Sequence, residues 1–530
     1  MTRAEQLYEA ITLVDDDLID AAGDYKPKAK RAVFRPWMAA AACLVLVVGL
    51  GAGVVSGRIP LLRMGSNAPA NSSGSSMGDT AIPGGSAEGS GANGGSTFMS
   101  YAGPVFPLTA LNGVEGLAAE RDITLDFASW ASSGSYSTDL LVTDSYTLTN
   151  PTAEDKEVTL LYPFTASLSG LDRYIPALTV DSTEVETALH AGSYTGGFLG
   201  AGGADDGESW NLSQLDNWEE YKVRLSDGSY LAHALREYPD LTDIPAIVYE
   251  FTDPWGEERS SAAGRPNPTI GVEFHLDFNK TSILSDGFNG MSQRIEKGWM
   301  YQEFSIPQPG WADYGKTRYL IVIGEDIWDM TTGGYATGGS WDAPPTVEAD
   351  VTVTRYETDL DTVLRQAAGQ MFRSWQQNRE DVESVGFELY YGLLCDYLMT
   401  YGVLSDNPAM RYGNGWLWDM DFEVVDRVFY LETTVTVPAG GSVEVTAEMT
   451  KAASFDFYGG RNENLGVYGY DLVTQLGSTL TFTGQTATLE DRGQIQIVRQ
   501  NFGFDLENGG KTVTLDPAEE HYYLEVRRLS

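Results

Sequence analysis

The chain has 530 residues, a formal net charge of -41 at pH 7, and 12 Trp, 28 Tyr and 20 Phe. At about 150 residues per domain, this length predicts two or three globular units, and the many aromatic side chains exclude a largely disordered chain. So acidic a surface repels phosphate, which excludes nucleic acid as a partner. The only cysteines are Cys43 and Cys395, which excludes a disulfide-stapled secreted scaffold.

Residues 1–36 are predicted to form a cytoplasmic amphipathic leader. Leu7, Ile11, Val14 and Leu18 follow helical spacing and form one apolar stripe, while acidic residues occupy the other faces. An isolated helix of this length is marginally stable in water, so the stripe needs a surface to pack on. We expect the four residues to bind a cytoplasmic protein partner or a second copy of the helix. The alternatives are the membrane surface, which the acidic face disfavours, and a passive leader that only sets topology.

Residues 37–56 are predicted to be a transmembrane helix. The segment 37–55 carries no charge, and a helix of that length spans about 28 Å, close to the ~30 Å hydrocarbon core of a bilayer. Basic residues cluster between residues 26 and 35, so the positive-inside rule places the N-terminus in the cytoplasm and the bulk of the chain outside. A cleaved signal peptide would have a shorter leader, and a lipoprotein signal would place its apolar run before Cys43.

The leader, its basic patch and the Ala-rich apolar segment together resemble the N-termini of single-pass membrane proteins from clostridial-type bacteria. Some of these are similar to membrane-bound anti-sigma factors. The resemblance covers residues 1–57. It implies that the cytoplasmic segment holds a sigma factor and that the external domain senses a signal.

Residues 57–99 are predicted to be a flexible stalk, because residues 65–98 consist mainly of Gly, Ser, Ala and Asn. A flexible coil of that length spans about 30–35 Å root-mean-square. Such a segment would hold the folded domain away from the membrane.

Residues 100–358 and 426–530 are predicted to be β-rich, the second as a C-terminal β-sandwich region. Apolar and polar residues alternate in short segments separated by polar turns, which is typical of a mainly β fold built from β-sandwich modules. The clearest segments are 122–127, 145–164, 271–278, 348–356, 429–449, 479–490, 494–500, 511–515 and 521–528. The continuous apolar run at 319–324 predicts a central strand.

Residues 359–425 are predicted to be a helical insert followed by a loop. Apolar residues recur there at helical spacing in two stretches. They are Leu360, Val363, Leu364, Ala367, Ala368, Met371, Phe372 and Trp375 in the first, and Leu389, Tyr390, Leu393, Leu394, Tyr397 and Leu398 in the second.

Segments 149–163 and 435–445 are similar to immunoglobulin-like modules of bacterial surface proteins. Each contains a Pro and a short polar turn between alternating apolar residues. The resemblance implies an immunoglobulin-like sandwich and no particular activity, because such sandwiches carry many functions.

No motif predicts catalysis, a cofactor or a metal. Residues 310–317 match the phosphate-loop pattern, but an apolar strand rather than a helix follows them, so we expect a turn. The four histidines lack metal-ligand spacing, and Cys395 lies on an apolar helix face. Two alternatives stay open: calcium at acidic clusters such as 419–423, and a hydrolase with an unrecognised carboxylate pair.

Trp416 and Trp418 are the predicted ligand-binding residues, because they share a side of an extended segment within the glycine-rich stretch 412–422. Exposed Trp pairs stack on sugars or cover peptides, so cell-wall glycan or peptide is the expected ligand. The alternative is that this stretch packs against the helical insert.

Together these features predict a membrane-anchored extracytoplasmic sensor or regulatory protein that is not an enzyme. It would be anchored in the cell membrane by residues 37–56, with its N-terminus in the cytoplasm. The alternative is a surface ligand-binding protein or adhesin whose N-terminus is only an anchor.

Overall fold

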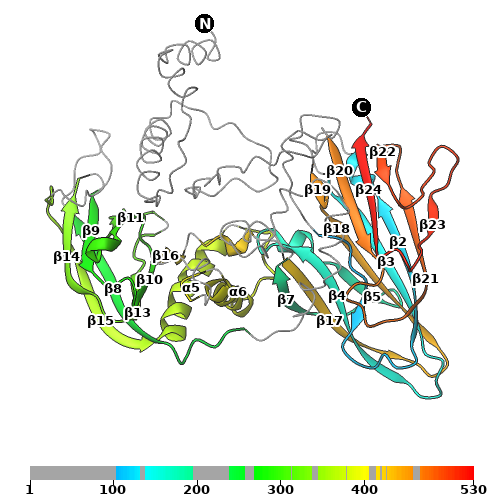
Figure 1. The fold of residues 1–530 in the computed structure, drawn as a ribbon, viewed down its shortest axis with the longest axis horizontal. Coiled ribbons are helices and arrows are strands. Elements are labelled where there is room, and N and C mark those ends of the chain that lie inside the picture. The colour runs from blue at the N-terminus through cyan, green and yellow to red at the C-terminus, as the bar shows by residue number, and fades with distance from the viewer. Residues whose placement is uncertain are drawn as a thin grey trace, which may run out of the picture. The chain divides into compact units, whose positions relative to one another are not determined.

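The computed structural model describes residues 103–131, 138–194, 238–256, 268–311, 313–336, 344–377, 379–400, 402–404, 414–417, 420–424, 427–456 and 466–529. This part of the chain is mainly β, as predicted, with antiparallel sheets and two α-helices (Figure 1). The predicted leader, transmembrane helix and stalk lie outside it. Across the described residues, no helix has the length and apolar character needed to cross a bilayer.

The first group of strands, the terminal β region, comes from both ends of the described chain and forms three sheets around one core. A seven-stranded sheet has the order β23-β21-β2-β3-β18-β5-β6. Its strands are β2 (Ala118–Asp126), β3 (Leu140–Thr149), β5 (Ala177–Val180), β6 (Thr183–Glu184), β18 (Ser442–Lys451), β21 (Phe482–Glu490) and β23 (Thr512–Thr514).

The other two sheets of this region have four strands each. The β4 sheet, in the order β1-β4-β17-β7, contains β1 (Thr109–Ala110), β4 (Lys156–Ala166), β7 (Ala188–Tyr194) and β17 (Arg427–Val437). The β24 sheet, in the order β19-β20-β24-β22, contains β19 (Phe455–Asp456), β20 (Val467–Val473), β22 (Ile495–Gln500) and β24 (His521–Arg528).

Strands from the two ends of the chain alternate within these sheets. β18 pairs with β3 along ten residues, β17 pairs with β4, and β21 lies parallel to β2, so blue and cyan strands lie beside orange and red ones in Figure 1. The predicted division into a β region at 100–358 and a separate sandwich at 426–530 therefore does not follow the sheets. Alternation along a strand reports which face is buried and not which strand is the partner.

The segments 149–156 and 437–442 are paired arches rather than hairpins. Each joins a strand of the seven-stranded sheet to a strand of the β4 sheet, and the two arches lie side by side. Asn150 fastens them: its side-chain amide donates to the carbonyls of Glu154 and Val437, its side-chain oxygen accepts from Thr152, and its backbone N–H donates to Gly441. This fully buried Asn is thus satisfied on every side.

The middle β region consists of two sheets that pack face to face around a second core. The five-stranded sheet, in the order β15-β8-β13-β10-β16, contains β8 (Pro245–Gly256), β10 (Thr281–Asp286), β13 (Arg318–Gly324), β15 (Ala349–Asp359) and β16 (Asn414–Trp416). The β9 sheet, in the order β11-β12-β9-β14, contains β9 (Thr269–His275), β11 (Gly290–Arg294), β12 (Trp299–Ser305) and β14 (Trp328–Tyr335).

Two helices fall where the helical insert is predicted: α5 (Leu360–Gln376) and α6 (Phe387–Thr400). α5 begins where the side chain of Asp359, its N-cap, accepts a hydrogen bond from the backbone N–H of Thr362 at 2.8 Å. Short 3₁₀ turns complete the described elements: η1 (Ala128–Ala131), η2 (Leu171–Arg173), η7 (Ile295–Lys297) and η9 (Asp421–Glu423).

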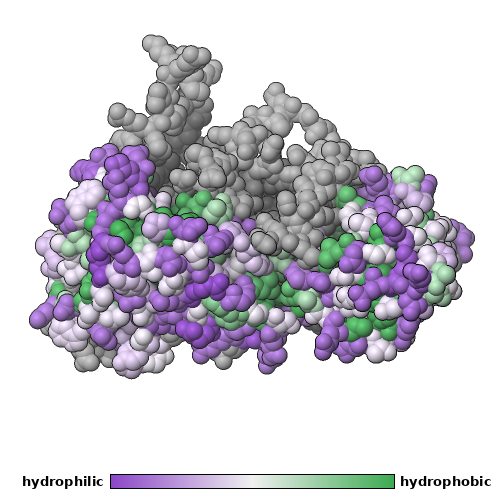
Figure 2. Space-filling model, turned by 90° about the horizontal axis from the view of Figure 1, so that it is seen from below, coloured by the Kyte–Doolittle hydropathy of each residue, from purple (hydrophilic) through white to green (hydrophobic). Residues whose placement is uncertain are grey.

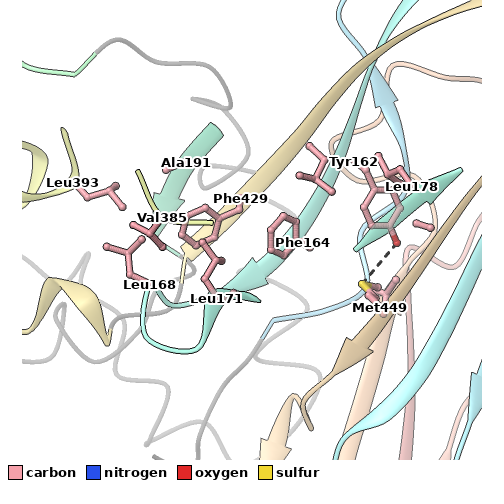
Figure 3. Packing of buried hydrophobic residues seen from close by; sticks show 14 of the residues in the cluster. Tyr162, Phe164, Leu168, Leu171, Leu178, Ala191, Val385, Leu393, Phe429 and Met449 are labelled. Carbon is pink, nitrogen blue, oxygen red and sulfur yellow. Dashed lines mark hydrogen bonds between the residues drawn. The ribbon is translucent and has the colours of Figure 1, made fainter. Parts of the chain in front are cut away.

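The helices connect the two β regions through one continuous core. Buried residues of both helices cluster with Phe164 and Phe429 of the β4 sheet and with Val248 and Ile321 of the five-stranded sheet. Figure 3 follows this core from Tyr162 between the sheets to the helical insert. The helical insert is therefore an internal layer of the fold.

Candidate functional site

Trp416, one of the two predicted ligand-binding residues, ends the short strand β16 and lies opposite Ser285 of β10. Its side chain is half-buried and packs against the core of the middle β region. Leu417 and Phe422, which follow in the chain, belong instead to the core that contains the helices. There the centroids of the Phe422 and Tyr390 rings are 5.0 Å apart. The expected alternative, packing against the insert, thus applies to Phe422 and Leu417 and not to Trp416.

The other predicted binding residues lie outside the described part of the chain. These are Trp418 and the leader residues Leu7, Ile11, Val14 and Leu18. Their roles stay predictions.

A buried carboxyl group lies close to this junction, at the end of β10. Burial raises the pKa of Asp286 to about 6, although Lys316 and Arg318 nearby favour its charged form. Asp286 faces the helices. Burial raises the pKa of the Tyr390 hydroxyl there, and the charge of Asp286 adds to this. That hydroxyl donates to Glu423 at 3.1 Å. The junction between sheet, helix and η9 is therefore polar and titratable.

Exposed aromatic side chains are concentrated in the middle β region. The large aromatic residues that the described surface exposes are Trp255 (54%), Trp311 (46%), Tyr314 (57%) and Trp328 (47%), and all four belong to this region or its turns. The described terminal β region exposes large aliphatic residues such as Leu111 and Leu529 instead. On the face drawn in Figure 2, hydrophobic residues form small separate patches among hydrophilic ones. Contact with a ligand is therefore expected at single aromatic rings rather than across a broad apolar interface.

One row of side chains crosses the whole β9 sheet on its outer face. Arg294 of β11 lies opposite Trp299 of β12, which lies opposite His275 of β9, which lies opposite Trp328 of β14. Side chains directly opposite one another in an antiparallel sheet lie on the same face. Val272, Phe274 and Leu276 point the other way into the core, as predicted.

Trp328 is the exposed end of this row, and its ring stacks on His275. The ring centroids are 6.2 Å apart and the planes differ by 21°. A β-bulge between Trp328 and Thr331, with Asp329 at a positive φ, lets Trp328 lie on the outer face while Met330 packs against the core. One side of the indole therefore faces the histidine, and much of the ring is open to solvent.

Within and next to this row, on the same outer face, two aromatic side chains are held in place by hydrogen bonds to carboxylates. The indole N–H of Trp299 donates to Glu273 at 2.7 Å, and the hydroxyl of Tyr301 donates to Glu303 at 2.9 Å. The rings of Trp299 and Tyr301 are nearly parallel and both are buried. A Cβ added at Gly271 would overlap the Tyr301 ring, so the glycine lets that ring lie close to the sheet.

A fully buried ion pair is the centre of a structural network in the terminal β region. Arg121 makes two hydrogen bonds to Asp144, at 2.8 and 2.9 Å, and a third to the carbonyl of Val473. Tyr146 and Tyr162 donate their hydroxyls to the same carboxylate, and burial holds the pKa of both well above its ordinary value. Every partner is internal, so the network joins sheets and offers no reacting group to a ligand.

The remaining motifs give no reactive site. Residues 307–311 and 313–317 form turns that lead into β13, as expected, so no helix N-terminus faces the described part of the loop. Burial raises the pKa of Cys395 to about 12, which makes its thiol a poor nucleophile. Within the described ranges, no three His, Cys, Asp or Glu side chains gather in a way that could hold a metal ion.

No protein-family model matches the chain, and no curated protein matches its sequence. The resemblance of residues 1–57 to membrane-bound anti-sigma factors therefore stays a prediction. The same holds for the immunoglobulin-like segments 149–163 and 435–445.

The Trp328 row was not predicted from the sequence. The alternation of segment 271–278 indicates that His275 and Glu273 share its polar face, but the sequence gives no sign that Trp299 and Trp328 are the neighbours of His275 on either side. The alternation Trp299, Tyr301, Glu303 was the available signal. Large aromatic residues at every second position, opposite a second apolar set, indicate a strand with apolar side chains on both faces.

Proposed function

We propose that this chain is a membrane-anchored extracytoplasmic sensor without catalytic activity, and that the middle β region is its ligand-binding part. The observation that carries this proposal is the concentration of exposed aromatic residues, Trp328 among them, in that region. A continuous core joins it through the helices to the terminal β region. Ligand binding would therefore act on one body attached to the membrane by the stalk and residues 37–56.

The predicted leader favours a sensor over a simple adhesin. Its apolar stripe, Leu7, Ile11, Val14 and Leu18, has a role if a cytoplasmic protein binds it. The resemblance to membrane-bound anti-sigma factors makes a sigma factor the first candidate for that protein. The resemblance to immunoglobulin-like surface modules agrees with a recognition domain outside the cell.

Capture of the cytoplasmic partner tests the proposal. Full-length protein is solubilised from membranes and compared with a variant in which Leu7, Ile11, Val14 and Leu18 are all changed to Ser, and bound proteins are identified by mass spectrometry. A matched control changes Glu5 and Glu9 on the acidic face to Ser. A protein retained by the wild type and the control but lost from the stripe variant supports a sensor.

Identical captures from all three proteins would contradict it and favour the adhesin. The specific observation in favour of that second candidate is again the exposed ring of Trp328, since ligand binding at the surface does not need the leader. Retention of cells or cell-wall material by the external domain would then be the main activity.

A further inference from the structure

We propose that the outer face of the β9 sheet binds a neutral glycan, with Trp328 as the ring on which a sugar stacks. This rests on the proposed function only in that the domain faces the outside of the cell. The named site is the Trp328 face: Trp328, His275 and Glu273, with Trp299 and Tyr301 beside them on β12.

The orientation of Trp328 fits a sugar ring. Its indole is nearly parallel to the imidazole of His275, and Trp328 is 47% exposed. A flat aromatic surface on the side away from His275 is therefore open to solvent. The negative face of an aromatic ring attracts the slightly positive C–H groups of an apolar sugar face. Because His275 already supports one side of the indole, little side-chain freedom is lost when a ligand stacks on the other.

Hydrogen-bonding groups lie directly beside this ring. Glu273 lies two positions before His275 on β9, on the same face, and accepts one hydrogen bond, from Trp299. A carboxylate has about four lone-pair sites, so Glu273 keeps capacity for sugar hydroxyls. Nδ1 of His275 is buried and has no hydrogen-bond partner among the described residues. An unpaired buried nitrogen beside an exposed ring is a second, independent indication of a ligand or bound water.

Other ligand classes fit this face less well. A quaternary amine needs rings that converge around it, whereas Trp328 and His275 are stacked. An anionic glycan would be repelled by a chain of net charge -41. A peptide side chain needs an apolar pocket, but Trp299 and Tyr301 are packed together and hydrogen-bonded to Glu273 and Glu303. A neutral chain of hexoses needs only a flat ring flanked by acceptors.

The fixed aromatic side chains beside the site prepare it for binding. Tyr301 lies against Gly271 and donates to Glu303, and Trp299 donates to Glu273, so neither ring has to move when the ligand arrives. Trp299 and Trp328 are separated by one strand, which places them about 10 Å apart. Trp299 is buried, so Trp328 is the ring of this pair that a sugar can reach.

Binding of chitotetraose, a neutral β-linked glycan, to the full-length solubilised protein tests the proposal by titration calorimetry or tryptophan fluorescence. Trp328→Ala is expected to weaken binding about tenfold, since one aromatic contact contributes about 1.4 kcal/mol. The matched control is Leu111→Ala, which removes a similarly exposed large apolar side chain from the terminal β region, outside the proposed ligand-binding part. It should bind as the wild type does.

A second variant, His275→Phe, keeps the stacked support but removes the imidazole nitrogens, and is expected to weaken binding several-fold. Thermal unfolding of each variant shows whether the fold is intact. Wild-type protein that does not bind chitotetraose, or Trp328→Ala that binds it unchanged, would overturn the proposal. Neither result affects the capture of a cytoplasmic partner by the leader, so the sensor proposal would be judged separately.

Discussion

Arg121 and Asp144 form a two-bond ion pair whose side chains have no exposed surface, in the core of the terminal β region. Arg121 comes from β2 and also reaches Val473 of the β24 sheet, while Asp144 comes from β3 and collects two tyrosine hydroxyls, one of them from β4. Three sheets thus meet at one ion pair. A buried charge of this kind is tolerated because it is paired with an opposite charge and hydrogen-bonded.

Removing one partner of this pair should therefore be costly. Asp144→Ala leaves the Arg121 guanidinium buried without its counter-ion, and we expect it to lower the free energy of unfolding by about 3–5 kcal/mol. The double variant Arg121→Leu, Asp144→Leu should lose less than Asp144→Ala alone, because no charge remains unpaired. Urea unfolding of the full-length protein, followed by tryptophan fluorescence, measures both. A double variant less stable than the single one would show that the pair stabilises the fold beyond its desolvation cost.

Asn150 should be equally hard to replace, because its side chain holds the two arches together. Asn150→Ala removes the hydrogen bonds to Glu154, Val437 and Thr152 and leaves their groups unpaired. We expect a loss of about 2–3 kcal/mol in unfolding free energy. The control Asn112→Ala, at a solvent-exposed asparagine that bonds Thr159, should cost less than about 1 kcal/mol. Equal losses at the two positions would contradict a special role for the arches.

Strand positions and burial were predictable, whereas the partners of strands were not. The run at 319–324 correctly indicated a central strand: Leu320 and Val322 face the β9 sheet, while Ile321 faces the helices. The polar turn after Thr149 was equally visible, but a hairpin and an arch share the same pattern of turn and alternation. Which sheet each strand joins is decided by contacts hundreds of residues apart, such as that between β3 and β18. A single sequence carries no record of those contacts.

The same limit applies to the candidate site. Trp416 stood out because it lies in a glycine-rich stretch with a second Trp, yet its ring packs partly against a core. Trp328 has no such local signal, and its importance comes from His275, which is 53 residues earlier in the sequence and opposite it in the sheet. Surface rings supported by a neighbouring strand need the sheet register before they can be recognised.

The thiol of Cys395 is expected to be unreactive in the folded protein. Burial raises its pKa to about 12, so almost no thiolate is present at pH 8. In a Cys43→Ser variant, which leaves Cys395 as the single cysteine, iodoacetamide should label the chain only after denaturant is added. Mass spectrometry of intact protein measures the labelled fraction. Rapid labelling without denaturant would mean that α6 opens readily.

Asp286 should make stability depend on pH between about 4 and 6. Its pKa is raised from 3.8 to about 6 by burial, so the folded state binds its proton more tightly than the unfolded state does. The contribution of this group to unfolding free energy is therefore full below about pH 4, falls as the pH rises to about 6, and is level above that. Asp286→Asn does not titrate. Relative to the wild type it should gain stability across this window, by about 2–3 kcal/mol at most.

Urea unfolding of wild type and Asp286→Asn at pH 4.5 and at pH 8 measures this difference. The many other acidic groups titrate alike in both proteins, so subtracting the two curves isolates Asp286. A matched control, Asp313→Asn, changes an exposed acid that pairs with the same Arg318 and should show little change between the two pH values. A stability difference for Asp286→Asn that is the same at both pH values would mean that Lys316 and Arg318 compensate fully for the burial of the carboxylate.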